Sequence, residues 1–545
     1  MRVTPIMQNS CKKQNKPSFE GQGKLTVKLV DLASDKGKRL FEGFLKPLDA
    51  FVLHGVSKEK AETGIVQMLQ QLGILTFKKE FARVGKTAIV EADAAIFSEA
   101  GLTRAGIDSI ELRGGALKEN LVTKASVEIQ QGARHSAISA PYVSVSGKQA
   151  EGCGTISATK FHAVGAVVTG HVNAKEAAFI GSTNTAGINV ENELLLVNGS
   201  KTKGIKAKEA TLYDTSELHG GQVETVSAKT NSLVQETTGK ALRVEGVSRA
   251  VETAFDQIQL SENARVFGGK TGFISNNNKG RVVGTAVDGA VYNHQEGVLR
   301  YVKAKEIFNT ENAKAIYVDC ELLRNRADAQ VHGGYARNIL NEGNGLVSDV
   351  VCEVADTSGS SRLKDVTVRE RLTTRGDSVV ENSNVKEMKC SDDSKGIGIK
   401  AEKVTLMDSS WISGSEAKKV ILFDSSEASY LKVENLSMTH EAGVSDIEAT
   451  GTVLAECSKS DVINLDRIKA KKIETYRYTR AANLEAEELV FEGHTMLSGV
   501  IKGKIKKMSR NVTIEPGTQF DEAAMKSLPW HIRLRQHKNY SLFKA

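Results

Sequence analysis

Residues 399–410 read Ile399-Lys-Ala-Glu-Lys-Val-Thr-Leu-Met-Asp-Ser-Ser410, and the chain carries this line more than once. Residues 205–216 read Ile205-Lys-Ala-Lys-Glu-Ala-Thr-Leu-Tyr-Asp-Thr-Ser216, with Ile-Lys-Ala, Thr-Leu, Asp and Ser at equivalent places. Within groups of such lines the interval is 16 or 17 residues. The lines that can be aligned at four apolar positions begin at residues 190, 207, 401, 417, 433, 449, 470 and 486. A fixed period of this kind is the signature of a repeat architecture.

The apolar positions inside each line alternate with charged ones. Ile399, Ala401, Val404 and Leu406 recur as Leu431, Val433, Leu436 and Met438, and across the eight lines only Ser415, Thr452 and Thr475 are not apolar. Alternation between two faces is the period of a β-strand. The break in parity between the second and third apolar positions indicates a corner or bulge. The Asp-Ser-Ser that follows is typical of a turn.

A unit of 16–17 residues cannot bury its own apolar face, but a stack of such units can. The sequence therefore predicts a mostly β fold, a parallel β-solenoid (β-helix) with coils of about 16–17 residues over residues 85–516. We expect Leu406, Leu422, Met438 and Leu454 to form one internal ladder. Residues 260–390 are less regular and rich in glycine and asparagine around 268–289. They indicate either a solenoid with inserted loops or a break between two solenoid blocks.

The two ends lack the repeat. Residues 1–23 are polar and predict a disordered segment. Residues 24–84 predict a small α/β cap, with strands near Lys24–Leu32 and Ile74–Lys78 and a helix between Ser57 and Gly73. Residues 517–545 predict a C-terminal cap helix at Asp521–Leu528 and a basic tail. The basic tail is either a binding site for an acidic partner or a solvated terminus. Caps are expected because the end coils of a solenoid are open sheet edges.

Composition narrows the class of protein. The 545 residues include 40% hydrophobic residues but only 5% aromatics and six prolines, and the net charge of +7 comes from 73 basic and 66 acidic residues. So balanced a mixture does not indicate nucleic-acid binding. The six dispersed cysteines, without a CxxC pair, predict buried thiols rather than disulfides; they are Cys11, Cys153, Cys320, Cys352, Cys390 and Cys457. The N-terminal residues show no apolar run of a signal peptide, so we expect a cytoplasmic protein, with signal-less export as the alternative.

Motifs that carry chemistry are weak throughout. Gly85-Lys-Thr87 and Gly269-Lys-Thr271 lack the glycine that a phosphate-binding loop has five residues earlier. Asp214, Asp408 and Asp424 suit either a calcium ladder or turn capping, and the calcium repeat motif is absent. His332 and His494 are expected on the surface. We predict no catalytic, cofactor-binding or metal-binding residues and no cofactor.

The enzymatic alternative is a polysaccharide lyase or hydrolase on a parallel β-helix. Such enzymes use clustered carboxylates and aromatic sugar platforms, and here only the pair Asp392-Asp393 beside Lys395 and the tryptophans Trp411 and Trp530 are available. The short coils leave little room for the loops that build a substrate groove. The sequence therefore favours a protein that is not an enzyme.

In coil length and in its charge-flanked aliphatic ladders, the repeat resembles that of bactofilins, the polymer-forming β-helical cytoskeletal proteins of bacteria. It is also similar to the stalks of large β-helical adhesins. The resemblance covers about 400 residues and implies a bacterial structural protein, but the chain is several times longer than a bactofilin and lacks an adhesin's secretion domain. No functional residue can be transferred from either family.

Two functional classes remain. One is a structural or self-assembling scaffold, and the other is an extended rod that binds a protein or glycan, as an adhesin does. No nucleic-acid partner and no membrane span are expected.

Overall fold

The computed structural model describes residues 28–29, 75–76, 81–84, 86–90, 102, 106–457, 461–530 and 532–533. The predicted fold class is confirmed: the chain is a parallel β-solenoid of about 26 turns, with 67% of residues in strands and 2% in helix. It divides into two compact units, Met1–Val223 and Glu224–Ala545. The predicted helix between Ser57 and Gly73 and the predicted disordered segment 1–23 lie outside the described residues.

The first unit begins with short antiparallel pairs. β1 (Lys28–Leu29) pairs with β2 (Leu75–Thr76), and β3 (Phe81–Val84) pairs with β4 (Thr87–Val90). From β4 onward the pairing is parallel. The longest strands of this unit are β10 (Ile138–Lys148), β11 (Ile156–Val168), β12 (Val172–Ile180), β14 (Ile188–Val197) and β15 (Lys201–Leu212). Five of their inward residues stack in register: Ile138, Ile156, Val172, Ile188 and Ile205.

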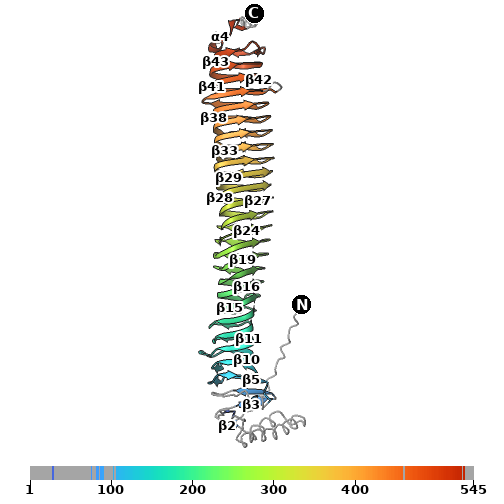
Figure 1. Ribbon diagram of the computed structural model, residues 1–545, viewed down its shortest axis with the longest axis vertical. Helices are drawn as coiled ribbons and strands as arrows, with labels where there is room; N and C mark the ends of the chain where they lie inside the picture. Colours follow the sequence, from blue (N-terminus) through green and yellow to red (C-terminus); the bar gives the residue numbers. More distant parts are fainter. Residues whose placement is uncertain are drawn as a thin grey trace. The chain divides into compact units, whose positions relative to one another are not determined.

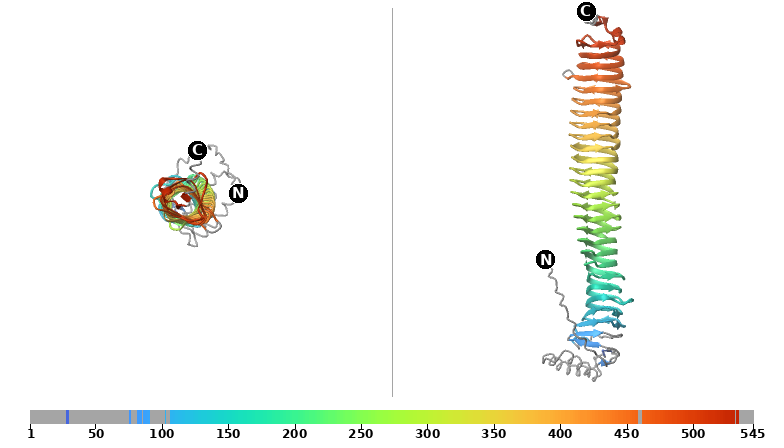
Figure 2. Two further views of the ribbon diagram at one scale, coloured as in Figure 1. Left: turned by 90° about the horizontal axis from the view of Figure 1, so that it is seen from above. Right: turned by 180° about the vertical axis from the view of Figure 1, so that it is seen from behind.

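The second unit repeats one coil design, shown by the stacked strands between β19 and β43 in Figure 1. A short strand such as β34 (Lys395–Ile397) leads through a corner at Gly398 into a longer one such as β35 (Lys400–Leu406). Gly398 has φ +65, which glycine adopts without strain. One coil later β36 (Trp411–Ser413) and β37 (Glu416–Leu422) lie directly above them. The coils of this unit also stack one above another in the side view of Figure 2.

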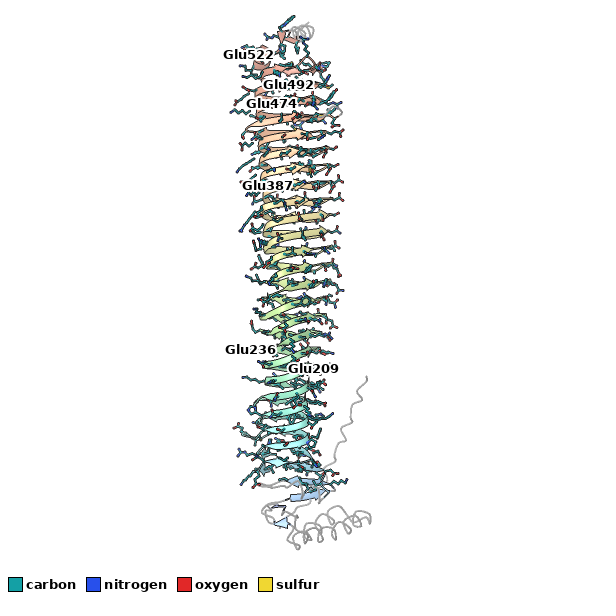
Figure 3. The ribbon with its side chains drawn as sticks, viewed as in Figure 1. Glu209, Glu236, Glu387, Glu474, Glu492 and Glu522 are labelled. Atoms are coloured by element: carbon teal, nitrogen blue, oxygen red, sulfur yellow. The ribbon has the colours of Figure 1, made fainter. Side chains whose placement is uncertain are left out.

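The interior of the second unit is formed by ladders of like residues. Val404, Val420 and Leu436 are buried in register, as are Leu406, Leu422 and Met438. Charged side chains such as Glu387 stand on the outside of the coils (Figure 3). Ser415 and Thr475, the polar exceptions within the repeat, are true inward positions at 2% and 0% exposure. Each apolar side chain in a ladder is shielded from water because the equivalent side chains of the coils before and after it cover it.

The prediction that Leu454 continues the internal ladder is wrong. Met438 pairs with Ala455, whereas Leu454 pairs with the outward Ser437 and is only half-buried. The step from Val433 to Ala449 is 16 residues, but the step from Leu436 to Val453 is 17. The extra residue lies at the Thr450–Thr452 corner, and it moves Thr452 out of the inward set. A one-residue slip exchanges the two faces of a strand.

The irregular middle of the sequence is continuous solenoid. Parallel pairs run without a break from β17 (Leu233–Val244) through β21 (Lys270–Asn276) and β29 (Leu346–Gly359) to β33 (Asn384–Cys390). The successive steps from Ile274 to Val291 to Ile307 are 17 and 16 residues, which leave no room for inserted loops. Both sequence interpretations, inserted loops and a break between blocks, are therefore corrected.

The coils in this middle region replace an apolar ladder by buried asparagines. Asn276, Asn293, Asn309, Asn325 and Asn341 are all fully buried. Each Nδ2 donates to the Oδ1 of the next asparagine, at distances of 2.7, 2.7, 2.9 and 2.8 Å. Each also donates to the carbonyl four residues ahead, as Asn309 does to Ala313 at 3.2 Å. The amides therefore close the turn of their own coil and hold the next coil in register.

The asparagine ladder ends differently on its two sides. Before it the inward residue is Leu260, and Asn276 Oδ1 has no hydrogen-bond partner. After it Asn341 Nδ2 donates to the carbonyls of Gly345 and Arg362 at 2.9 and 3.1 Å. The ladder thus leaves one amide oxygen without a partner. The opposite orientation of the amides would instead leave an NH2 group, with its two donor protons, unpaired. Buried carbonyl oxygens are more often left under-satisfied than buried N–H groups.

Replacing Leu422 by lysine tests the apolar register. The ammonium would be buried without a partner, so we expect a loss of about 4 kcal/mol or more in unfolding free energy, measured by denaturant unfolding. Leu454→Lys is the matched control, because Leu454 lies on the outer face, and it should cost less than about 1 kcal/mol. Equal losses for the two variants would contradict the register.

Replacing Asn309 by alanine tests the polar ladder. The change removes the acceptor of Asn293 and the donor to Asn325, Ala313 and Gln330. Because each unpaired buried group costs about 1–3 kcal/mol, we expect a loss of about 3 kcal/mol or more. Asn312→Ala, in the exposed part of the same turn, should leave the melting temperature unchanged. A neutral Asn309→Ala would show that the amides do not support the stack.

Candidate functional surfaces

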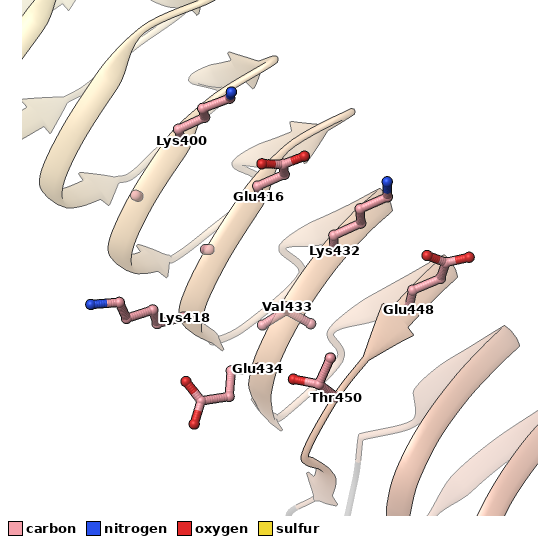
Figure 4. A pocket seen from close by; sticks show the side chains of 10 residues that line it. Lys400, Glu416, Lys418, Lys432, Val433, Glu434, Glu448 and Thr450 are labelled. Atoms are coloured by element: carbon pink, nitrogen blue, oxygen red, sulfur yellow. The ribbon is translucent and has the colours of Figure 1, made fainter.

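A shallow groove follows the outer corner of several coils in the second unit (Figure 4). Its floor consists of Ala401, Ala417 and Val433, whose small side chains let the backbone turn tightly. One wall carries Lys400, Glu416, Lys432 and Glu448, and the other carries Lys418, Glu434 and Thr450. The hollow has a volume of about 440 Å³ and is open to solvent.

The first wall belongs to a longer row of side chains whose charge alternates from coil to coil. We call it the alternating row, and it consists of Lys400, Glu416, Lys432, Glu448, Lys469, Glu485 and Lys502. Glu485 lies between two lysines, with oxygens 3.4 Å from Lys469 Nζ and 3.3 Å from Lys502 Nζ. Hydrogen bonds from Lys502 and then Lys469 lower the pKa of the Glu485 carboxyl. On the second wall Lys418 pairs with Glu402 at 3.2 Å.

The alternation has a simple electrostatic reason. Successive coils lie roughly 4.8 Å apart. Two like charges at about this distance repel by about 1 kcal/mol in water, and opposite charges attract by as much. A Glu485 carboxyl with a lowered pKa stays ionised, whereas a general acid near neutral pH needs a raised pKa. The charges that line the groove of the second unit alternate in sign from coil to coil.

The equivalent corner of the first unit has one neutral wall, whereas Lys175 and Glu191 also line the hollow. Ser139, Ser157, Asn173 and Asn189 occupy the positions that correspond to the alternating row, over a floor that includes Ala140, Ala158 and Ala174. The corner geometry is therefore a property of the coil, and only its outer side chains differ.

Of the three turn aspartates singled out in the sequence, Asp408 accepts a backbone amide. Asp214, Asp408 and Asp424 all have φ between 55 and 60, the left-handed conformation of the turn. Asp392 Oδ2 accepts the Gly376 amide at 3.0 Å, and Asp408 Oδ2 accepts the Asp392 amide at 3.3 Å. Asp392 of the Asp392-Asp393 pair is thus engaged with the preceding coil. Among the described residues there is no group of three or more His, Cys, Asp or Glu side chains placed to hold a metal ion.

The remaining residues singled out in the sequence are dispersed over the surface. His332 is exposed and its Nδ1 lies 3.0 Å from an Asp349 oxygen, and His494 stacks on Tyr478 with ring centroids 4.9 Å apart. Lys270 of the Gly269-Lys-Thr271 motif pairs with Asp288 at 2.9 Å, and Thr271 is buried in β21. Strand rather than helix follows this motif. Lys86 pairs with Asp108. Trp530 is 74% exposed and Trp411 is half-buried.

The cysteines in the described residues are free thiols. Cys320, Cys352, Cys390 and Cys457 are buried as predicted, whereas Cys153 is half-buried. Burial raises the pKa of Cys320 and of Cys352 to about 12, and that of Cys390 to about 11. Such thiols react slowly because the thiolate is the reactive form. Cys11 lies outside the described residues.

The C-terminal helix covers part of the last coil's backbone. The predicted helix is confirmed as α4 (Glu522–Ser527), with Asp521 as its N-cap. Below it lies β43 (Thr495–Met508), whose Gly503 amide donates to the Asp521 carboxylate at 3.1 Å and whose Ile505 amide donates to Ser527 Oγ at 2.8 Å. Ala524 and Leu528 are buried at 0% and 1% exposure. The first half of β43 is covered by β44 (Thr513–Ile514) and β45 (Gln519–Phe520). Beyond these short strands, side-chain acceptors take the place of backbone carbonyls.

No family model matches the chain, and no curated protein matches its sequence. Within the described residues, no helix has the length and apolar character needed to cross a membrane.

Reversing one charge of the alternating row tests its electrostatic role. Lys432→Glu would place three carboxylates in successive coils, so we expect a loss of about 1–2 kcal/mol in unfolding free energy at low ionic strength. At 1 M salt, where the Debye length is about 3 Å, most of the loss should disappear. The neutral control Lys432→Gln should show a smaller loss. A loss for Lys432→Glu that does not depend on salt would contradict this explanation.

Proposed function

We propose that this chain is a non-enzymatic structural scaffold whose C-terminal end is blocked against further stacking. The observation that carries the proposal is the cap formed by Asp521, Ser527 and α4 on β43. An uncapped solenoid end presents unpaired N–H and C=O groups that template pairing with another chain. A chain that closes this end with its own helix is suited to remain a unit of fixed length.

The surface of the second unit supports the same proposal. The alternating row places each charge next to opposite charges of the neighbouring coils. Glu485 is held ionised by two lysines, and the turn carboxylates of Asp392 and Asp408 accept backbone amides. These side chains stabilise coils and turns. The proposal also keeps the cytoplasmic assignment, which suits the free thiols of the described residues.

Removing the cap tests the proposal. A chain that ends at Gly517 lacks β45 as well as Asp521, Ser527 and α4, and it would leave the Gly503 and Ile505 amides of β43 without their acceptors. We expect it to form dimers or short filaments in sedimentation velocity and negative-stain microscopy, because its last coil becomes an open sheet edge. The full chain should sediment as a monomer.

The matched control is a chain that ends at Arg533, which keeps α4 and loses only the tail beyond it. It should stay monomeric. Filaments of the full chain at physiological salt would contradict the capping proposal and favour a polymer. A well-folded, strictly monomeric chain ending at Gly517 would show that the C-terminal segment is not a cap.

A further inference from the structure

Five successive coils in the second unit present a cation on the same outer face. The strands are β18 (Arg249–Val251), β20 (Arg265–Phe267), β22 (Arg281–Val283), β25 (Val298–Arg300) and the start of β27 (Lys314–Asn325), which lie between the labels β16 and β27 in Figure 1. We call the five side chains the basic face: Arg249, Arg265, Arg281, Arg300 and Lys314.

The register places these side chains in two neighbouring rows. Arg249, Arg265, Arg281, Val298 and Lys314 form one row. The second row lies two residues further along each strand and contains Val251, Phe267, Val283, Arg300 and Ile316. Every outward position of the two rows is therefore either basic or apolar. Arg265 is half-buried, and the other four cations are exposed.

The basic face is not neutralised by the described part of the chain. None of its five cations forms an ion pair or a side-chain hydrogen bond there, and none is among the residues with a further interaction. Glu262 and Glu311, each three residues before a cation of the face, are exposed and form no ion pair with it. Four other acidic side chains close to it in sequence are engaged elsewhere. Glu245 lies 3.8 Å from Arg243, Glu252 accepts the Gly269 amide at 3.2 Å, Asp288 pairs with Lys270 at 2.9 Å, and Glu296 pairs with Lys279 at 3.6 Å.

This face departs from the charge pattern of the same unit. The alternating row sets a carboxylate between each pair of lysines, whereas Arg249, Arg265 and Arg281 stack like charge on like charge. At a spacing of roughly 4.8 Å such a stack is repulsive, so it destabilises the unliganded chain. An external polyanion would remove this repulsion by supplying one negative charge to each coil.

We propose that the basic face binds an extended anionic polysaccharide, with one carboxylate of the glycan facing each coil. In a chain of linked uronic acids each sugar contributes one carboxylate, and the length of a pyranose unit is close to the spacing of the coils. The outward side chains of Val251, Phe267 and Val283 offer apolar contacts to the C–H faces of the sugar rings. The arginines suit carboxylates because the guanidinium can donate two parallel hydrogen bonds.

Two other polyanions fit the face less well. An acidic peptide that adds as a strand needs a free sheet edge, but β20 and β22 are hydrogen-bonded on both sides. A single-stranded nucleic acid needs aromatic faces on which bases stack. Phe267 is the one aromatic residue in the two rows. The nearby Tyr301 and Tyr317 stack on each other with centroids 5.4 Å apart, which covers one face of each ring.

The test is titration calorimetry of the full chain with polygalacturonate oligomers at low salt. The test variant combines Arg249→Gln, Arg265→Gln and Arg281→Gln. The control variant combines Lys400→Gln, Lys432→Gln and Lys469→Gln, which removes the same charge from the alternating row. We expect the test variant to bind at least tenfold more weakly than the wild type and the control variant to bind within threefold of it.

Thermal melting provides a second readout that does not depend on the glycan. Without ligand, the test variant should melt above the wild type because a repulsive stack is removed, and the control variant should melt below it because attractive pairs are lost. Both variants must retain the β circular dichroism of the wild type.

Three results would overturn the proposal. The first is equal affinity of the wild type and the test variant for polygalacturonate. The second is tighter binding of the wild type to poly(dT) or to polyglutamate than to polygalacturonate, which would assign the face to a nucleic acid or an acidic peptide. The third is equal binding of neutral dextran, which would show that the cations do not select the ligand.

Discussion

Backbone hydrogen bonds between successive coils fix each residue of the solenoid directly above an equivalent residue of the coil before it. Because the strands are parallel and in register, every inward position becomes a ladder and every outward position becomes a row. The interior satisfies this constraint with apolar ladders such as Leu406, Leu422 and Met438, and with the hydrogen-bonded amides from Asn276 to Asn341. The stack ends with the short strands β44 and β45 on β43 and with Asp521 and Ser527, which accept two further amides of β43.

The same constraint decides what the surface can do. Side chains in one row are roughly 4.8 Å apart, so their charges cannot be independent of one another. From Lys400 to Lys502 the chain alternates the charge, so that each ion has opposite charges in the neighbouring coils of the row. From Arg249 to Lys314 it does not, and the basic face is left to interact with something outside the described chain. A scaffold and a binding surface can therefore occupy different coils of one unit.

Much of this architecture could be predicted from the sequence, and the failures have physical causes. The regular lines from residue 399 to residue 440 gave the correct strands, faces and register because their inward residues are apolar. At Thr450–Thr452 the local sequence allows two alignments, and only the pairing of Val453 and Ala455 with the preceding coil shows which one places the apolar side chains inside. The apolar pattern alone therefore places Leu454 on the inner face of its strand, whereas it lies on the outer face.

The asparagine ladder cannot be predicted from the apolar pattern of the repeat, because its inward side chains are polar. Its signal is an asparagine followed four residues later by glycine or alanine, repeated every 16 or 17 residues from Asn276 to Asn341. The charged rows are harder to predict, since a 17-residue step such as that from Arg281 to Val298 changes which residues share a row. Which side chains share an outer row of a solenoid can be determined only after the register of every coil is known.

The central claim is that one in-register stack continues through the irregular middle of the second unit. Lys303 and Lys400 occupy the same row six coils apart, and Lys469 follows four coils later. Electron–electron dipolar spectroscopy between spin labels at these positions, in a chain with Cys11 and Cys153 replaced by serine, measures the stacking directly. At roughly 4.8 Å per coil the account predicts about 29 Å for Lys303–Lys400 and about 48 Å for Lys303–Lys469. Distances that do not increase in proportion to the number of coils would contradict it.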